Sequence, residues 1–502
     1  MKNTISMHRN VNSAGSGDPA YTKRRRPGAL TGRHKSYPAL RSNSKQTMIG
    51  TIRADVLAYT AGKDVELDAR LVKADCIGSA AHVTMLAGLP LKPRLFSARD
   101  RSRVITELTR IMRRADRGAF TITLQDQDVH LAVERELTRR LGAVGRKIHT
   151  GRSRNDQVAV DLRLFAREQL LAVIEEALAL GSALLIQARR NRGVPMVGRT
   201  HLQPAMPSSI GLWASAYTED LLDDVRLLKG AYDLNDQCPL GSAAGYGVPL
   251  PLDRRQVSDL LGFRRPIHNV LHAGNSRGKL ESVILSALSQ VMITLSRLSE
   301  DLILFTMPEF GYFGLPPDMC TGSSIMPQKN NPDVLELVRA RAARVMACAQ
   351  AVMDIIKGLP SGYNRDLQEA KEPFMLGLTM TRASLRIMAP LVAGLKINRE
   401  ALRRGFTPAV FAADHALKLV ARGMPFRDAY HYVKKHLNEL DGLDPARAIA
   451  LKTHIGATAG LDFADMARLL AAERAFASAE KRRFSKKISQ LLRVPYPMER
   501  EA

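Results

Sequence analysis

Apolar residues recur at helical spacing along several long stretches of this chain. Residues 156–190 contain no proline, and Val160, Leu164 and Leu171 fall on one face of a helix there. Four further stretches follow the same pattern: 208–235, 277–307, 332–357 and 373–395. All are longer than the mean globular helix of about 11–12 residues, and long helices of this kind are typical of a bundle. Alternating strand patterns are scarce, so the sequence predicts an all-α fold with a long central helix bundle.

The position of the long helices also suggests how the chain divides into domains. We expect a basic, disordered tail over 1–48 and a small helical domain over 49–155. The central bundle then occupies 156–402, and a second small helical domain occupies 403–502. The predicted architecture is therefore a long bundle flanked by two smaller helical domains.

The composition is that of an ordinary globular protein. Of 502 residues, 45% are hydrophobic and 25% are charged. Every long apolar run is interrupted by charge, as 170–186 is by Glu175 and Glu176, so no membrane span is expected. The four cysteines lie far apart without a CxxC pair. This spacing excludes a disulfide scaffold and a thiolate zinc site, and it predicts a cytoplasmic protein.

Positive charge is in excess, with a formal net charge of +25. The segment 1–48 holds ten Lys or Arg against the single acid Asp18. A functionally neutral tail is the preferred interpretation of this segment; a transit peptide, a basic nucleic-acid-binding arm and an extension upstream of a start at Met48 stay open. Elsewhere a solvated basic surface is the preferred interpretation of the surplus positive charge, and binding of anionic small molecules is the alternative. No DNA- or RNA-binding motif accompanies it, so no nucleic-acid partner is expected.

The chemistry of the chain is concentrated in five polar connections between or beside the predicted helices. They are rich in Gly, Pro, Ser, Thr, Asn, Arg and Lys, and they cover 149–157, 198–207, 239–251, 321–333 and 359–369. Helix bundles place their sites between facing helices or at helix ends. These connections are therefore where a functional site is expected.

Among these polar connections, 321–333 has the composition most specific to a functional site. Gly322 permits close backbone approach, Ser323 and Ser324 offer hydroxyl and amide donors, and Lys329 adds a compact cation. Such a loop can hold a carboxylate and stabilise charge that develops on it. An ordinary capped turn is the alternative, and the length and composition of the segment argue against it.

Two other connections carry groups suited to catalysis or anion binding. His201 follows Thr200 in a proline-fixed loop, where it is a candidate acid–base group; a structural histidine is the alternative. Arg152 and Arg154 precede a predicted helix whose N-terminus favours anions, and a solvated charge run is the alternative there.

A metal site has weak support in the sequence. His268 and His272 have the i, i+4 spacing of paired metal ligands, but no Glu follows the first histidine as in an HExxH motif. We therefore interpret both histidines as structural or surface residues, and no metal is expected.

Four blocks together resemble the fumarase/aspartase superfamily, and most closely the argininosuccinate lyase family, to which the δ-crystallins are related. The blocks are HTGRSRNDQVAVDLRL, GRTHLQPAMP, GSSIMPQKNNPD and LPSGYNRDLQE, and the resemblance runs from about residue 59 to about residue 426. It implies reversible β-elimination of argininosuccinate to L-arginine and fumarate, in arginine biosynthesis, without metal or organic cofactor. It also implies a homotetramer with a twenty-helix core, in which each active site takes residues from three subunits.

The resemblance assigns roles to individual residues. Ser323 would be the general base, with Lys329 and the loop amides stabilising the aci-carboxylate that forms when the proton leaves. His201, with Glu336 as its charged partner, would help the departing guanidinium nitrogen accept a proton. Tyr363 would contact the arginine part of the substrate. The other residues implied to bind substrate or to line the pocket are Asp128, His130, Ser153, Arg154, Asn155, Thr200, Asn331, Gln368 and Lys371.

The chain also departs from the family pattern at several positions. Asn330 stands where many members have a second lysine, Gln127 replaces the usual acid before Asp128, and 272–278 is less acidic than is common. These departures bear on the substrate more than on the elimination mechanism. A lyase that releases fumarate from another N-substituted aspartate, and a non-catalytic protein like δ-crystallin, remain as alternatives.

Overall fold

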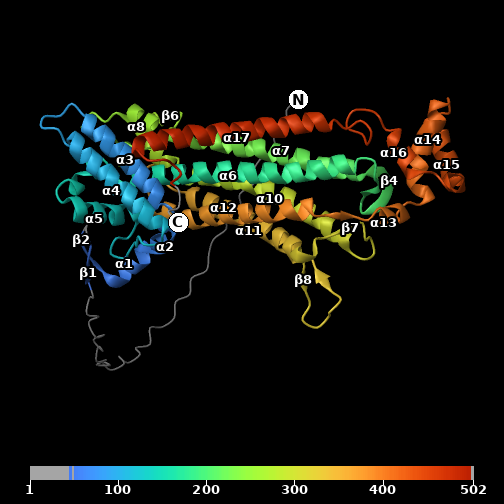
Figure 1. Ribbon diagram of the computed structural model, residues 1–502, viewed down its shortest axis with the longest axis horizontal. Coiled ribbons are helices and arrows are strands. Elements are labelled where there is room, and N and C mark those ends of the chain that lie inside the picture. Colours follow the sequence, from blue (N-terminus) through green and yellow to red (C-terminus); the bar gives the residue numbers. More distant parts are fainter. Residues whose placement is uncertain (1–43, 48–49, 499–502) are drawn as a thin grey trace, which may run out of the picture. The chain divides into compact units, whose positions relative to one another are not determined.

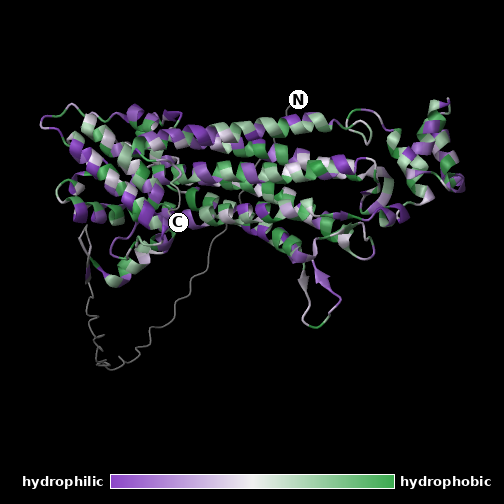
Figure 2. Cartoon of the chain, viewed as in Figure 1, coloured by the Kyte–Doolittle hydropathy of each residue, from purple (hydrophilic) through white to green (hydrophobic). Residues whose placement is uncertain are grey.

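Five long helices form a bundle and coincide with the five stretches predicted from the apolar pattern (Figure 1). The computed structural model describes residues 44–47 and 50–498, so the interpretations of the tail 1–48 lie almost entirely outside the described residues. The bundle helices are α6 (Arg154–Arg190), α7 (Ile210–Asn235), α10 (Lys279–Thr306), α11 (Asp333–Ile356) and α12 (Lys371–Ala393). Their inward faces are apolar and form one continuous core, which confirms the all-α prediction. Figure 2 shows hydrophobic residues distributed along every one of these helices.

The start of α6 follows from a local side-chain pattern. Ser153 caps the helix, and the carboxylate of Asp156 accepts a hydrogen bond from the backbone N–H of Ser153 at 2.9 Å. This reciprocal capping box is why the helix begins at Arg154, inside the polar connection and ahead of its first apolar residues. Helices α6 and α10 are long and apolar enough, by length and composition, to cross a membrane. The most apolar windows of these two helices are 56% and 67% buried in the bundle core, as expected of core helices.

A sixth long helix, α17 (Phe463–Leu492), lies along α6. Its buried positions include Leu470, Ala477, Phe484 and Leu491, seven residues apart, which gives a narrow apolar seam on an otherwise polar helix. Arg167 of α6 is fully buried beneath it, where the guanidinium pairs with Asp236.

Smaller helices pack at the two ends of the bundle. The first group comprises α1 (Ala54–Ala61), α2 (Asp64–Leu67), α3 (Val72–Gly88), α4 (Ala98–Asp116), α5 (Val129–Leu141), α8 (Arg254–Leu260) and α9 (Val270–Asn275). The second comprises α13 (Arg399–Arg404), α14 (Ala412–Ala421), α15 (Phe426–Lys435) and α16 (Pro445–Ala450), and it has a small core of its own around Phe411 and Ala429. The proposed domain boundaries stay a prediction.

Short antiparallel hairpins occupy two of the polar connections that were expected to be irregular. They are β3 (Pro195–Thr200) with β4 (Gln203–Ser209), and β8 (Thr321–Gly322) with β9 (Asn330–Asn331). The remaining pairs are β1 (Ser44–Thr47) with β2 (Gly50–Arg53), β5 (Gln237–Cys238) with β6 (Arg265–Pro266), and β7 (Phe313–Gly314) with β10 (Lys396–Ile397). Prolines interrupt any alternation in β3 and β4, which is why the sequence pattern did not indicate these strands.

Candidate active site

A cavity of about 200 Å³ opens where α2, α5 and the N-terminus of α6 meet the segment before α12. Seven of the residues implied to bind substrate or to line the pocket are found in its wall: Asp128, His130, Arg154, Asn155, Tyr363, Gln368 and Lys371. Ser153 does not line the cavity, because its hydroxyl caps α6. The cavity thus brings together side chains that lie more than 200 residues apart in the sequence.

Two helix N-termini supply charge to this cavity. Asp128 caps α5, its Oδ1 accepting the Leu131 N–H at 2.9 Å, and its Oδ2 lies 3.0 Å from Nε of Arg154. Arg154 is the first residue of α6, and its buried Nη2 has no hydrogen-bond partner among the described residues. A guanidinium nitrogen without a partner at a helix N-terminus is suited to a carboxylate ligand.

Lys371 lies in the cavity wall, but its charge is not free. Its side chain is 3% exposed, and its Nζ lies 2.9 Å from Asp64 and 2.5 Å from Asp68. Burial alone would lower the pKa of Lys371, but the two carboxylates outweigh burial and raise it. The sequence indicated neither aspartate as a site residue, because both lie some 300 positions away from Lys371.

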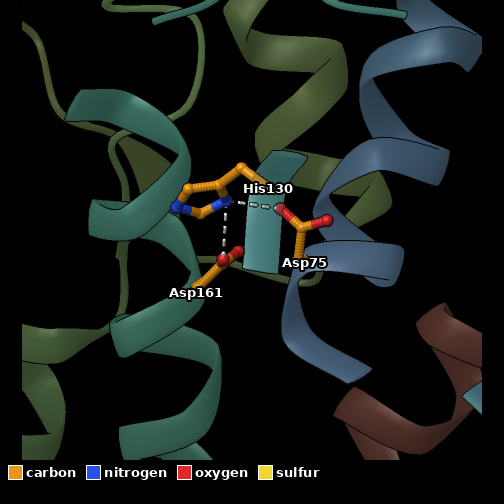
Figure 3. Close-up of side chains that lie close together, drawn as sticks. All are labelled: Asp75, His130 and Asp161. Atoms are coloured by element: carbon orange, nitrogen blue, oxygen red, sulfur yellow. Dashed lines mark hydrogen bonds and ion pairs between the residues drawn. The ribbon is translucent and has the colours of Figure 1, made fainter. Parts of the chain in front are cut away.

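His130 is held by two buried carboxylates (Figure 3). Its Nδ1 lies 2.7 Å from Oδ1 of Asp75 and 3.5 Å from Oδ2 of Asp161, and all three side chains are buried. Burial would lower the pKa of His130, but the hydrogen bond to Asp75 and the nearby carboxylates raise it to about 9. The donor atoms of this Asp–His–Asp cluster lie within 4.8 Å of one another, so the set has the spacing of a small cation site. Burial and the charge of Asp75 raise the pKa of Asp161 well above its usual range, and the positive charges of His130 and Arg152 oppose this rise.

The raised pKa of His130 predicts a pH-dependent stability. A group whose pKa rises on folding stabilises the protein fully below its unfolded pKa of about 6.5, and this stabilisation is lost as pH rises through about 9. We therefore expect the unfolding free energy to fall by an amount on the order of 3 kcal/mol between pH 6.5 and pH 9.5. Urea titrations of the wild type and of His130→Gln measure the effect, since the variant lacks the group. An equal pH slope in both proteins would contradict the assignment.

The β3–β4 hairpin presents His201 at its tip. His201 and Leu202 form the two-residue turn between Thr200 and Gln203, with φ of 53° and 62°. A two-residue hairpin turn of this type requires positive φ at both central residues; non-glycine residues there store backbone strain, and strained residues are enriched at functional sites. The geometry therefore supports a positioned role for the exposed His201.

The β8–β9 hairpin carries Ser323 and Lys329, two further catalytic residues predicted from sequence. Its loop projects from the start of α11 as an arm (Figure 1). Oγ of Ser323 accepts the Met326 N–H at 3.1 Å, so the serine hydroxyl is already positioned by backbone amides of the loop. Lys329 is exposed in the same loop, Asn331 lies in β9, and Glu336 follows in the first turn of α11.

Within one chain, the cavity, the β3–β4 hairpin and the β8–β9 hairpin do not come together in one site. The cavity lies at the end of the bundle that holds α5, the β3–β4 hairpin lies at the opposite end, and the β8–β9 arm projects from the side (Figure 1). No residue of either hairpin lines the cavity. The residues that line the cavity are thus separated, within one chain, from Thr200 and His201 of the first hairpin and from Ser323, Lys329 and Asn331 of the second.

The comparisons with known proteins agree on one family. The model of the lyase family matches residues 51–347. The chain is similar to the argininosuccinate lyase of Sorangium cellulosum, with 43% identity over 84% of this chain and 97% of that protein. It is similar also to the argininosuccinate lyase of Thermotoga neapolitana, with 38% identity over 78% of this chain and 98% of that protein.

Solved structures show the same fold. One similar structure is the EDDS lyase in complex with formate, with a TM-score of 0.73 and 23% identity over 87% of this chain and 95% of that one. A class II fumarase from Schistosoma mansoni has a TM-score of 0.62 and 18% identity over 80% of this chain and 98% of that one. These structures confirm the predicted fumarase/aspartase-like architecture.

Proposed function

This chain belongs to the lyase family, and we propose that its reaction is that of an argininosuccinate lyase, the reversible β-elimination of argininosuccinate to L-arginine and fumarate. The observation that carries the proposal is the 43% identity to a curated argininosuccinate lyase along nearly the whole length of that protein. The enzyme is a carbon–nitrogen lyase that acts on a small molecule in arginine biosynthesis. We place it in the cytoplasm because its four cysteines are free.

The proposed chemistry begins at the β8–β9 loop. Ser323 removes the proton from the carbon beside a substrate carboxylate, and the negative charge moves onto that carboxylate. Lys329 supplies a cation and the loop amides supply donors for this charge, and one of these amides, the Met326 N–H, already donates to Oγ of Ser323. His201, with Glu336 as its charged partner, assists protonation of the departing guanidinium nitrogen. The nitrogen and the proton thus leave from adjacent carbons, and fumarate remains.

Substrate binding is assigned to the cavity and the two hairpins. Arg154, Asn155 and Lys371 line the cavity and are expected to contact the acid groups, together with Thr200 and Asn331 from the hairpins. Ser153 was also expected to contact them, but its hydroxyl caps the helix that begins with Arg154 and Asn155. Tyr363 and Gln368 contact the arginine part. No organic cofactor or metal is part of this proposal.

The active enzyme is proposed to be a homotetramer with shared sites. The separation of the cavity and the two hairpins within one chain supports this arrangement, because neighbouring subunits can bring the three groups together. Helix α11 also exposes apolar side chains, with Leu337 at 52% and Met346 at 46%. Exposed apolar residues along a bundle helix are typical of a surface that a second subunit covers.

The proposed reaction is tested by product analysis. Purified protein given argininosuccinate in the presence of a chelator is expected to release arginine and fumarate in equal amounts. Release of neither product, or of fumarate with a different amine, would contradict the proposal.

A further inference from the structure

Asp64 is the one carboxylate in the cavity wall with an oxygen left over for a ligand. Lys371 contacts Oδ1 of Asp64 at 2.9 Å, and no described residue hydrogen-bonds to Oδ2. Asp68, beside it, uses both oxygens, Oδ1 for Lys371 and Oδ2 for the Val129 N–H at 3.1 Å. Asp68 is therefore satisfied within the fold. Asp64, with 14% of its side chain exposed, remains able to accept a bond from the cavity.

The charge around Asp64 favours a cationic ligand group. Asp64 and Asp68 share the single ammonium of Lys371, so the three side chains together carry one excess negative charge. Burial raises the pKa of Asp64, and the charges of Asp68 and Asp128 raise it further against the effect of Lys371. A cation placed beside Oδ2 relieves this repulsion, since it favours the ionised carboxylate.

Unused donors in the same cavity wall favour an anionic group close by. An ammonium has three donors, and Lys371 uses two of them on the aspartates. Arg277 also lines the cavity and is 6% exposed, and its Nη1 has no hydrogen-bond partner in the described part of the chain. A free carboxylate oxygen and free cationic donors around one small cavity match the two charges of an α-amino acid.

We propose that Asp64 is a specificity-determining residue that binds the α-ammonium group of the arginine part of the substrate. The inference rests on the proposed function, and it adds a residue that the family motifs did not indicate. The adjacent carboxylate of the same amino acid faces Lys371 and Arg277. Tyr363 and Gln368 lie in the same wall and are the residues already expected to contact this part of the substrate.

The test compares arginine with 5-guanidinopentanoate, which is arginine without its α-amino group, in the addition to fumarate. For Asp64→Asn, the KM for arginine is expected to rise about ten- to a hundredfold, the range of a hydrogen bond to a charged group. The KM for 5-guanidinopentanoate and the KM for fumarate stay unchanged, so the preference for arginine is lost. Glu66→Gln is the matched control, because Glu66 lies on the same helix, is exposed and does not line the cavity.

A binding measurement keeps this inference separate from the proposed reaction. Calorimetry with Ser323→Ala protein, with and without Asp64→Asn, reports the affinity for both compounds without turnover. Selective arginine binding that depends on Asp64 supports the inference even if no lyase activity is found. An equal change for both compounds, unchanged arginine binding in Asp64→Asn, or no arginine binding with Asp64 intact would overturn it, whatever the lyase assay shows. Thermal unfolding of each variant identifies a change caused by misfolding.

Discussion

Replacing Ser323 with alanine is expected to lower kcat by about 10²–10⁴-fold, the usual contribution of a general base. The affinity for argininosuccinate should change little, because the hydroxyl is needed only while the proton is being transferred. The Met326 N–H that now donates to Oγ of Ser323 stays in the loop, so the amides proposed to stabilise the developing charge are kept. Steady-state kinetics together with calorimetric binding separate the two effects.

The neighbouring serine provides the control for this prediction. Ser324→Ala removes a hydroxyl from an exposed position of the same loop and is expected to leave kcat within a few-fold of the wild type. If Ser323→Ala instead weakened binding at unchanged kcat, Ser323 would be a binding residue and the base would have to be sought elsewhere.

Mixing two inactive variants is expected to restore activity if the sites are shared between subunits. Ser323→Ala affects the β8–β9 arm, and Asn155→Ala affects the cavity, two places that one chain keeps apart. After denaturation and joint refolding at a 1:1 ratio, about a quarter of the sites should combine an intact arm with an intact cavity, since random assembly fills each position independently. Activity is measured before and after mixing.

A second pair of variants tests whether recovery requires the two defects to lie in different parts of the site. Ser323 and Lys329 belong to the same loop, so the same subunit supplies both to any one site. Mixing Ser323→Ala with Lys329→Ala is expected to restore nothing. Recovery in this pair, or failure of the first pair although mixed oligomers form, would contradict the shared-site arrangement.

The long helices were predictable from sequence because their apolar residues recur every three to four positions over more than twenty residues. Helix α17 was not predicted, since its buried seam of Leu470, Ala477 and Phe484 uses one position in seven. The hairpin at His201 was expected only as a polar loop. Tight hairpin turns are recognised from pairs such as Asn-Gly or Asp-Gly, which readily adopt positive φ. This turn carries His201 and Leu202 instead, so the residue types did not indicate it.

The candidate site was predictable where its residues are neighbours in the chain. Arg154 and Asn155 follow a recognisable cap at Ser153, and Ser323 and Lys329 share one loop. The carboxylates that control the charged groups come from distant helices. Asp75 and Asp161 meet His130, and Asp64 and Asp68 meet Lys371, only after the chain has folded. No local pattern reports such pairings, although an aspartate within an apolar helix, as Asp161 is, signals a buried partner.

Fumarate release from argininosuccinate, with adenylosuccinate and aspartate assayed in parallel, is the decisive measurement of the proposed reaction. We expect rapid release from argininosuccinate and none from the other two compounds. Release from adenylosuccinate or aspartate would indicate a lyase for a different substrate. No release from any of the three would contradict the proposed reaction and favour another N-substituted aspartate or a non-catalytic protein like δ-crystallin.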